Sequence, residues 1–246
     1  MSPSDLAIVG FGAWASSALA ITWGTFVPSG WLWGDVISRG TTNGPPRVAL
    51  TFDDGPTPGG TDRILDLLAE LKAPSTFFVI GQNVERHPDL LRRIDAEGHL
   101  IGNHTFDHHH WGVFGHRGFW RHQIERTDDA IERVVGKRPR IFRPPMGHKT
   151  FMTTGALQRT GKVMITWNVR CYDGLASATP QKILDRLLSR CGPGDIIILH
   201  DGVEPNRRRD PAVTVEALKP LVLGLRERGL EPARLDELTE IPPYSA

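Results

Sequence analysis

Two adjacent carboxylates and a pair of histidines are the residues of this 246-residue chain best suited to chemistry. Asp53 and Asp54 directly follow the apolar run 48–52, and His104 and His108 are four positions apart. Histidines with this spacing can face one metal ion from a single helical turn, and neutral imidazole is a common zinc ligand. Two histidines and one carboxylate leave coordination positions open for water and substrate, as hydrolytic metal sites require. We therefore predict that Asp54, His104 and His108 bind a divalent metal and that Asp53 is free to act as a base.

Hydrolysis also requires an acid for the leaving group, and His200 is a candidate for it. It follows the apolar run 196–199, which places an imidazole at the end of a strand. Each of these residues has a plainer interpretation as well. Asp before Gly-Pro is common turn chemistry, the segment around His104 could be a polar surface loop, and His200 could be a structural histidine. Their combination favours a hydrolytic metal site.

Strand and helix patterns alternate along the chain after residue 46. The predicted strands are 48–52, 75–80, 141–142, 163–169 and 196–199, and the predicted helices are 61–71, 89–97, 120–135, 180–190 and 214–229. Strands separated by helices imply a parallel sheet. We expect an α/β fold, a closed or nearly closed β/α barrel, with a doubly wound sheet as the alternative. Catalytic groups in such folds gather where strands end, and Asp53, Asp173 and His200 all follow predicted strands.

Composition narrows the classes of function further. The chain has 29 basic and 28 acidic residues, so its net charge of +1 lacks the basic footprint of a nucleic-acid binder. Cys171 and Cys191 are too few for a disulfide scaffold or a four-thiolate zinc site, although one bridge between them is possible. They also lack the CxxC spacing that redox chemistry would suggest.

The N-terminus differs from the rest of the chain because residues 6–34 contain no charged residue and no histidine. Residues 6–27 would form a helix about 33 Å long, enough to cross a bilayer core of about 30 Å. Trp23, Trp31 and Trp33 would lie near one end of it, where membrane-interface aromatics are found. We therefore expect a membrane anchor, and a membrane-anchored or secreted protein that faces the cell envelope.

Two alternatives for this segment remain, a cleaved secretory signal and a buried helix. Residues 18–20 (Ala-Leu-Ala) resemble a small-residue cleavage site, but residues 1–5 lack the Lys or Arg of a typical signal. The predicted organisation has four parts. They are an N-terminal hydrophobic segment at 1–39, a Gly/Pro-rich linker at 40–46, a catalytic domain at 47–240 and a tail at 241–246.

Four motifs occur in this order along the chain: TFDDGP at 51–56, HTFDH at 104–108, RPPMG at 143–147 and LH at 199–200. Together they resemble the motifs of polysaccharide deacetylases of carbohydrate esterase family 4, the NodB-homology domain. The resemblance covers nearly all of the chain after residue 46. It implies a distorted β/α barrel and a divalent metal, with zinc the expected ion and cobalt or another divalent ion the alternative. Members of this family remove N-acetyl or O-acetyl groups from chitin-type oligosaccharides, peptidoglycan or acetylated xylan.

The resemblance also implies roles for the acid–base residues. Asp53 corresponds to the catalytic base, and Asp54, His104 and His108 correspond to the metal ligands. Arg143 would hold the base in place by a charge-assisted contact, which could be bidentate.

Further roles follow for the residues around the substrate. Pro145, Met146 and Leu199 are implied to bind substrate, with Leu199 lining the acetyl pocket. Met146 stands where the family usually has Tyr, whose backbone N–H stabilises the oxyanion, and a main-chain donor does not depend on the side chain. His200 would protonate the leaving amine, and Asp173 would tune that imidazole.

One motif departs from the family pattern. The family often has Asp-x-x-Asp-Trp where this chain has Arg-Cys-Tyr-Asp-Gly at 170–174. The departure concerns the wall of the sugar site and not its chemistry, and Trp111, Trp120 or Tyr172 could supply an aromatic platform instead. The run 207–209 (Arg-Arg-Arg) could contact phosphate or carboxylate on a substrate or form a solvated loop.

We expect a metal-dependent hydrolase that removes acetyl groups from N-acetylated amino sugars of a peptidoglycan-like or chitin-like glycan and releases acetate. An O-acetyl esterase and a deacetylase of a lipid-linked sugar are the alternatives within the enzyme class. A non-catalytic glycan-binding barrel is the alternative from another class. The expected partners are an acetylated glycan and a membrane, with no nucleic acid.

Overall fold

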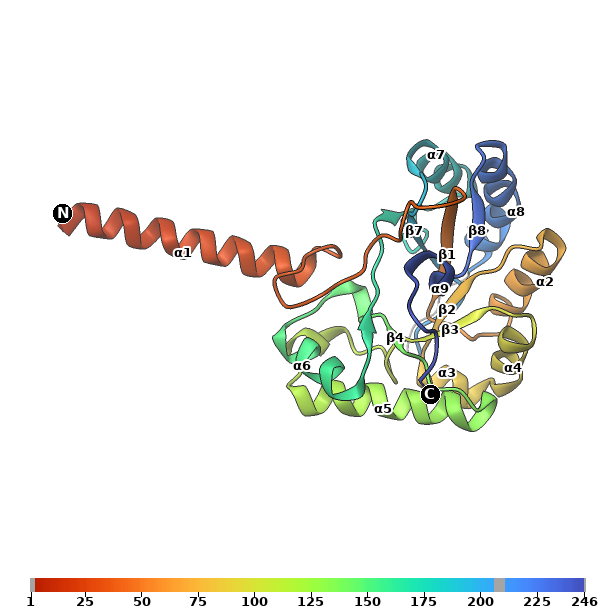
Figure 1. Ribbon diagram of the computed structural model, residues 1–246, viewed down its shortest axis with the longest axis horizontal. Coiled ribbons are helices and arrows are strands. Elements are labelled where there is room, and N and C mark those ends of the chain that lie inside the picture. Colours follow the sequence, from red (N-terminus) through yellow and green to blue (C-terminus); the bar gives the residue numbers. More distant parts are fainter. Residues whose placement is uncertain (1–2, 206–210, 246) are drawn as a thin grey trace.

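A curved parallel sheet lies at the centre of the protein in a computed structural model, which describes residues 3–205 and 211–245, with side chains from Trp14 onward (Figure 1). The strands in that part of the chain are β1 (Arg47–Asp53), β2 (Thr76–Val79), β3 (Leu100–Asn103), β4 (Ile141–Phe142), β5 (Val163–Met164), β6 (Val169–Arg170), β7 (Ile196–His200) and β8 (Glu231–Ala233). Their order is β5-β4-β3-β2-β1-β7-β6, and β8 pairs with the first residues of β1.

The central strands are apolar because both of their faces are covered. In β7, Ile196 and Ile198 pack inside the curved sheet with Phe78 and Trp167. The alternate residue Ile197 belongs to the larger core between the sheet and the helices. Side chains of a strand alternate between its faces, so the β7 residues on both faces must be hydrophobic.

The segment 163–170 joins the two ends of the sheet, and the prediction of one strand at 163–169 is wrong. β5 pairs with β4 at one end of the strand order, and β6 pairs with β7 at the other. Between them, Thr166 donates its N–H to Ile37 and Asn168 donates its N–H to Ile196, so this segment exchanges one set of partners for another. The expected distorted barrel is confirmed, and the doubly wound alternative is not the observed fold.

Most helices cover the outside of this sheet, whereas the last one, Leu235–Thr239, packs Leu235 and Leu238 against the cluster inside it (Figure 1). These helices are α2 (Thr61–Leu71), α3 (Gly81–Arg86), α4 (Pro88–Ala96), α5 (Arg117–Val135), α6 (Phe151–Thr160), α7 (Pro180–Arg190), α8 (Ala212–Glu227) and α9 (Leu235–Thr239), with 3₁₀ turns η1 (His110–Phe114) and η2 (Pro145–Gly147). The ranges expected for α2 and α7 are confirmed to the residue. The short elements α3, α9, β3 and β8 were missed, as was α6, which begins with a capping box formed by Thr150 and Thr153.

The N-terminal helix α1 (Pro3–Phe26) extends away from the sheet and its covering helices (Figure 1). Trp14, Leu19 and Trp23 are exposed, which contradicts the alternative of a buried helix for the side chains described. Among the described residues, no helix has the length and apolarity needed to cross a membrane. Beyond its end, the chain contacts the barrel, where the Lys149 ammonium donates to the carbonyl of Val27 at 2.7 Å.

The two cysteines are both free and buried, so the bridge that the sequence left open is absent from the structure. Burial raises the pKa of the Cys191 thiol to about 12 and raises that of Cys171 as well. Thiols of this kind are inert, in agreement with the missing CxxC spacing.

Candidate active site

The two adjacent carboxylates occupy the end of β1. Asp53 is the last strand residue, and Asp54 follows it in a left-handed backbone conformation with φ 76°. The chain after β7 passes very close by, because a Cβ on Gly202 would lie 2.4 Å from the backbone of Asp54. Only glycine permits this approach. Asp201 stabilises this contact between the segments that follow β1 and β7, because its carboxylate accepts from the Gly55 N–H at 3.2 Å.

Arg143 holds Asp53 in place, as expected. It follows β4, is fully buried, and donates from Nη1 to Asp53 Oδ1 at 2.7 Å. The same nitrogen donates to Thr51 Oγ1 at 2.8 Å, so one guanidinium nitrogen makes the contact and it is not bidentate. Nη2 donates to the Thr166 carbonyl, and the guanidinium lies over the Phe78 ring. Asp53 is therefore held by a rigid, fully buried cation.

His104 and His108 come from a loop after β3 and not from the helical turn that we expected. Thr105 and His108 have φ of 67° and 53°, which a helix does not allow. Local hydrogen bonds stabilise this loop instead: the Asn103 side chain accepts from the Thr105 N–H, and Thr105 Oγ1 accepts from the His108 N–H. Gln123 on α5 accepts from two further N–H groups of the loop. The imidazole rings nevertheless lie 4.9 Å apart.

Asp54, His104 and His108 form a donor set that fits one metal ion. Nε2 of His104 and Nε2 of His108 lie 3.6 and 3.5 Å from Asp54 Oδ1. All three residues are buried, and Asp54 Oδ1 has no hydrogen-bond partner among the described residues. An unpartnered buried carboxylate oxygen that faces two imidazole nitrogens is the arrangement a divalent cation would satisfy.

Hydrogen bonding at the other ring nitrogen of His104 supports the same role. Its Nδ1 lies 2.8 Å from the Arg143 carbonyl, which can only accept, so Nδ1 carries the proton and Nε2 presents its lone pair to Asp54. Burial, together with the neighbouring His108, lowers the pKa of His104 to about 3. The imidazole is therefore neutral, as a metal ligand must be.

Glu204 and His110 also lie at this site, although the sequence motifs indicated neither of them. Glu204 Oε2 lies 3.5 Å from His108 Nδ1 and forms a very short contact with His110 Nε2. Burial acts to raise the pKa of Glu204, but the neighbouring imidazoles of His108 and His110 outweigh it and lower the pKa to about 2. Glu204 is 94 positions from His110, so no local spacing could have revealed the pair.

His200 and Asp173 lie together on the same cavity. His200 Nδ1 lies 2.8 Å from Asp173 Oδ1, and the other Asp173 oxygen accepts from the His200 N–H and from Thr214 Oγ1. Burial acts to lower the pKa of His200, but the Asp173 carboxylate, with Asp54 and Asp53, raises it to about 9. The imidazole is thus oriented through Nδ1 and protonated at neutral pH, as a general acid requires.

A cavity of about 590 Å³ brings these groups together. Its lining includes the two aspartates at the end of β1, the imidazoles of His104 and His108, and also His200, Asp173 and Met146. Met146 has φ 57°, and among the described residues its N–H has no acceptor, which leaves a main-chain donor for substrate. Pro145 is buried beside it in η2.

The placement of Leu199 corrects an expectation. Leu199 packs in the outer core under the helices and does not line the cavity, whereas Ile198 does. Ile198 and His200 lie on the same face of β7 because side chains two positions apart share a face. The expected acetyl-pocket residue was therefore displaced by one position.

Of the three aromatic platform candidates, only Tyr172 lines the cavity. Trp120 is buried in a core cluster with Phe142, and Trp111 is exposed beside Phe114. The arginines at 207–209 lie outside the described residues.

Comparisons with known proteins agree with this geometry. The family model described as polysaccharide deacetylase matches residues 40–165. The chain is 37% identical over 194 residues to a chitooligosaccharide deacetylase of Sinorhizobium fredii, covering 76% of this chain and 88% of that protein. It is 32% identical over 203 residues to a peptidoglycan-N-acetylglucosamine deacetylase of Bacillus cereus, covering 78% and 87% of the two chains.

A solved structure is similar over nearly the same range. The crystal structure of a peptidoglycan N-acetylglucosamine deacetylase superposes with a TM-score of 0.78 at 28% identity, covering 85% of this chain and 95% of that one. The sequence, the order of the motifs and the fold thus lead to one conclusion. The chain belongs to the polysaccharide deacetylase family of hydrolases.

Proposed function

We propose that this chain removes the acetyl group from the nitrogen of N-acetylated amino sugars in a peptidoglycan-like or chitin-like glycan, with zinc as its metal. The observation that carries the proposal is the division of labour between two neighbouring carboxylates. Asp54 faces His104 and His108, whereas Asp53 is held by Arg143. A metal ligand and a base are thus supplied side by side at one strand end.

The residues of the chain have separate tasks in this reaction. An ion held by Asp54, His104 and His108 would supply Lewis-acid polarisation of the acetyl carbonyl and of the attacking water. Asp53 accepts the proton of that water, and the Met146 N–H donates to the acetyl oxygen as negative charge develops on it. His200 donates the proton of Nε2 to the sugar nitrogen, whose bond to the acetyl carbon breaks to give acetate and an amine.

The names of the relatives support N-deacetylation over O-deacetylation. The relatives described above are a chitooligosaccharide deacetylase and a peptidoglycan-N-acetylglucosamine deacetylase. The protonated His200 supports it too, since an amine is a poor leaving group and needs a proton more than an alcohol does.

Acetate release by the full chain tests the proposal. The chain is incubated with zinc, cobalt or EDTA and offered chitooligosaccharides, peptidoglycan or acetylxylan. We expect acetate from an N-acetylated glycan, and its loss with EDTA. Acetate from acetylxylan alone would favour the O-acetyl esterase. Bound metal with no acetate from any of the three would point to a lipid-linked sugar, and the absence of both metal and acetate would favour the glycan-binding barrel.

We also propose that the N-terminal segment attaches the chain to a membrane, so that the catalytic domain faces the cell envelope. Trp14, Leu19 and Trp31 are 69%, 72% and 70% exposed, and the exposure of several large apolar side chains to water is unfavourable. The test is flotation of the full chain with lipid vesicles. Recovery with the vesicles, lost when Trp14 and Leu19 are both changed to Glu, supports the proposal. A chain that stays in the aqueous fraction, or a mature N-terminus after Ala20, contradicts it.

A further inference from the structure

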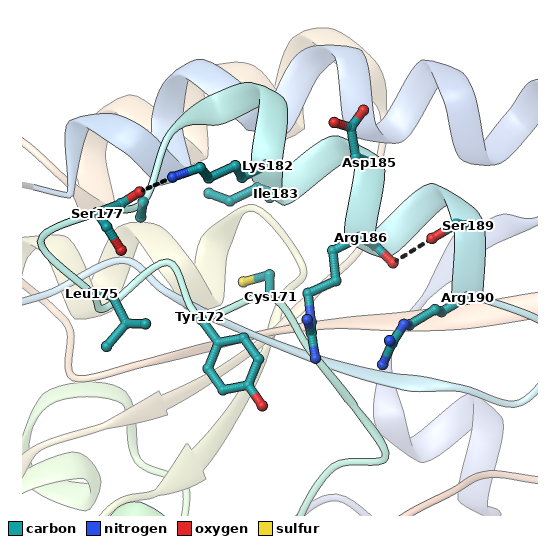
Figure 2. Close-up of a pocket in the computed structure, with 11 residues that line it drawn as sticks. Cys171, Tyr172, Leu175, Ser177, Lys182, Ile183, Asp185, Arg186, Ser189 and Arg190 are labelled. Carbon is teal, nitrogen blue, oxygen red and sulfur yellow. Dashed lines mark hydrogen bonds between the residues drawn. The ribbon is translucent and has the colours of Figure 1, made fainter.

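A second cavity of about 460 Å³ adjoins the active-site cavity. It lies between α7 and the loop that follows β6, and Figure 2 shows the side chains that line it. Tyr172, Leu175 and Ala178 line both cavities. A glycan whose acetylated sugar sits at the metal residues can therefore extend past Tyr172 into the second cavity.

Cationic side chains dominate the second cavity. Lys182, Arg186 and Arg190 line it from successive turns of α7, at a spacing of four residues, and Asp185 is the single carboxylate among the described residues of the lining. We call these three cations and the cavity they line the basic pocket. Figure 2 shows Arg186 and Arg190 extending from the same side of α7. Residues four apart share a helix face, so the sequence itself brings these charges together.

No carboxylate of the described residues forms an ion pair with the charges of the basic pocket. Among the described residues, none of the three cations has a carboxylate oxygen within 4.0 Å, whereas Arg143, Arg138 and Arg234 elsewhere in the barrel all do. The Asp185 carboxylate accepts from the Gln181 amide at 2.7 Å instead. An accessible cavity with surplus positive charge attracts an anion.

Neutral hydrogen bonds position two of the cations without consuming their charge. The Lys182 ammonium donates to the Ser177 carbonyl at 2.9 Å, as the dashed line in Figure 2 shows. Arg186 Nε donates to the Arg170 carbonyl at 2.7 Å, which leaves the outer nitrogens of its guanidinium available. A pre-positioned guanidinium binds carboxylate or phosphate at a smaller entropic cost.

Tyr172 separates the two cavities in a conformation that costs energy. Its φ is 60°, unusual for an aromatic residue, and backbone strain of this kind gathers at functional sites. The guanidinium carbons of Arg186 and Arg170 lie 4.3 and 5.0 Å from its ring centre. Arg170 itself lines the active-site cavity, so positive charge continues from one cavity to the next.

We propose that the basic pocket binds a carboxylate or phosphate carried by a sugar next to the one that is deacetylated. This inference rests on the proposed function for the position of the acetylated sugar. It limits the preferred substrates to anionic glycans, such as those that bear lactyl ether carboxylates, and excludes neutral chitin chains from them.

The test compares substrates that differ in one charge. A tetrasaccharide of alternating N-acetylglucosamine and N-acetylmuramic acid is used as the free acid, as its methyl ester, and as a form with phosphate in place of the carboxylate. Calorimetry with the full-length Asp53→Asn variant gives the Kd of each without turnover. Acetate release by the full chain gives kcat/KM for each in a separate measurement.

We expect the free acid or the phosphate to bind about tenfold more tightly than the ester. The double variant Lys182→Gln/Arg190→Gln should reduce the ratio of the Kd of the ester to the Kd of the acid to about twofold, because both changed side chains are exposed cations of the pocket. Arg159→Gln removes the same kind of exposed charge from α6 and should leave the ratio unchanged. Raising the salt concentration should lower the ratio in the wild type.

Equal Kd values for acid, phosphate and ester in the wild type would overturn the inference, as would a ratio that the double variant leaves intact. A charge-dependent Kd without any acetate would retain the basic pocket and count against the proposed function. Acetate release with no dependence on the substrate's charge would support the proposed function and overturn the assignment of the basic pocket.

Discussion

The metal side and the α7 side of the active-site cavity are built in opposite ways. On the metal side, Asp54, His104 and His108 are buried, and each follows a strand closely. On the α7 side, Arg170 at the end of β6 and Tyr172 in the loop that follows it are exposed, beside the three cations of the basic pocket. The first side matches the motifs of the family, and the second departs from them.

This difference has a physical cause. The chemistry needs ligands fixed to a fraction of an ångström, so His104 is bonded to a backbone carbonyl and Asp53 to a buried guanidinium. Sugar recognition tolerates side chains that move in water, and their charge can differ without loss of the fold. We infer that the metal side determines which bond is broken and the α7 side determines which glycan is accepted.

Removing a metal ligand should give the largest effect. His104→Ala should abolish metal binding and lower kcat/KM at least about 10³-fold, since Lewis-acid activation is worth several kcal/mol. Metal analysis and acetate release on the same preparation measure both. His109→Ala is the matched control, because His109 is an exposed neighbour in the same loop. Full activity in His104→Ala would refute the assignment of the metal side.

Weakening the acid should give a smaller effect. Asp173→Asn removes the carboxylate that orients His200, so kcat should fall about 10- to 100-fold with metal binding retained.

The pH profile of the same variant supplies a second readout. Burial acts to lower the pKa of His200, but the nearby carboxylates raise it to about 9, so activity should decline as the pH rises through that value and the imidazolium loses its proton. Without the Asp173 charge this decline should begin at lower pH. An unshifted profile in Asp173→Asn would mean that another group is the acid.

A change on the α7 side should give the smallest effect. Tyr172→Ala should raise KM about 2- to 10-fold, the range expected for loss of one aromatic contact, with kcat nearly unchanged. Steady-state kinetics on a chitooligosaccharide measure this. A loss of kcat above about 100-fold would show that the two sides cannot be separated as described.

Most of the strands and helices that form the buried core could be predicted from the sequence, because burial requires apolar residues in short, regular patterns. The apolar run before Asp53 and the helical periodicity of α2 and α7 gave correct elements. The failures depend on context that periodicity lacks. A run at 163–169 has the composition of one strand, yet it is divided between two ends of the sheet.

Other failures concern single residues. Thr105 adopts a left-handed conformation that replaces the expected helical turn, and a shift of one position exchanged Leu199 for Ile198 as the cavity-lining residue. Glu204 could not be found without the fold. The cations of α7 did carry a signal, since Lys182, Arg186 and Arg190 recur every four residues on a helix that the sequence predicts.

The most direct test compares the two adjacent carboxylates at the end of β1. Asp53→Asn and Asp54→Asn are prepared as full-length chains, and each is analysed for bound zinc and for acetate release from an N-acetylated oligosaccharide. We predict that Asp53→Asn keeps about one metal per chain and loses about 10³-fold in kcat. Asp54→Asn should lose the metal itself. Wild-type turnover in Asp53→Asn, or full metal content and activity in Asp54→Asn, would contradict the division of roles on which the account rests.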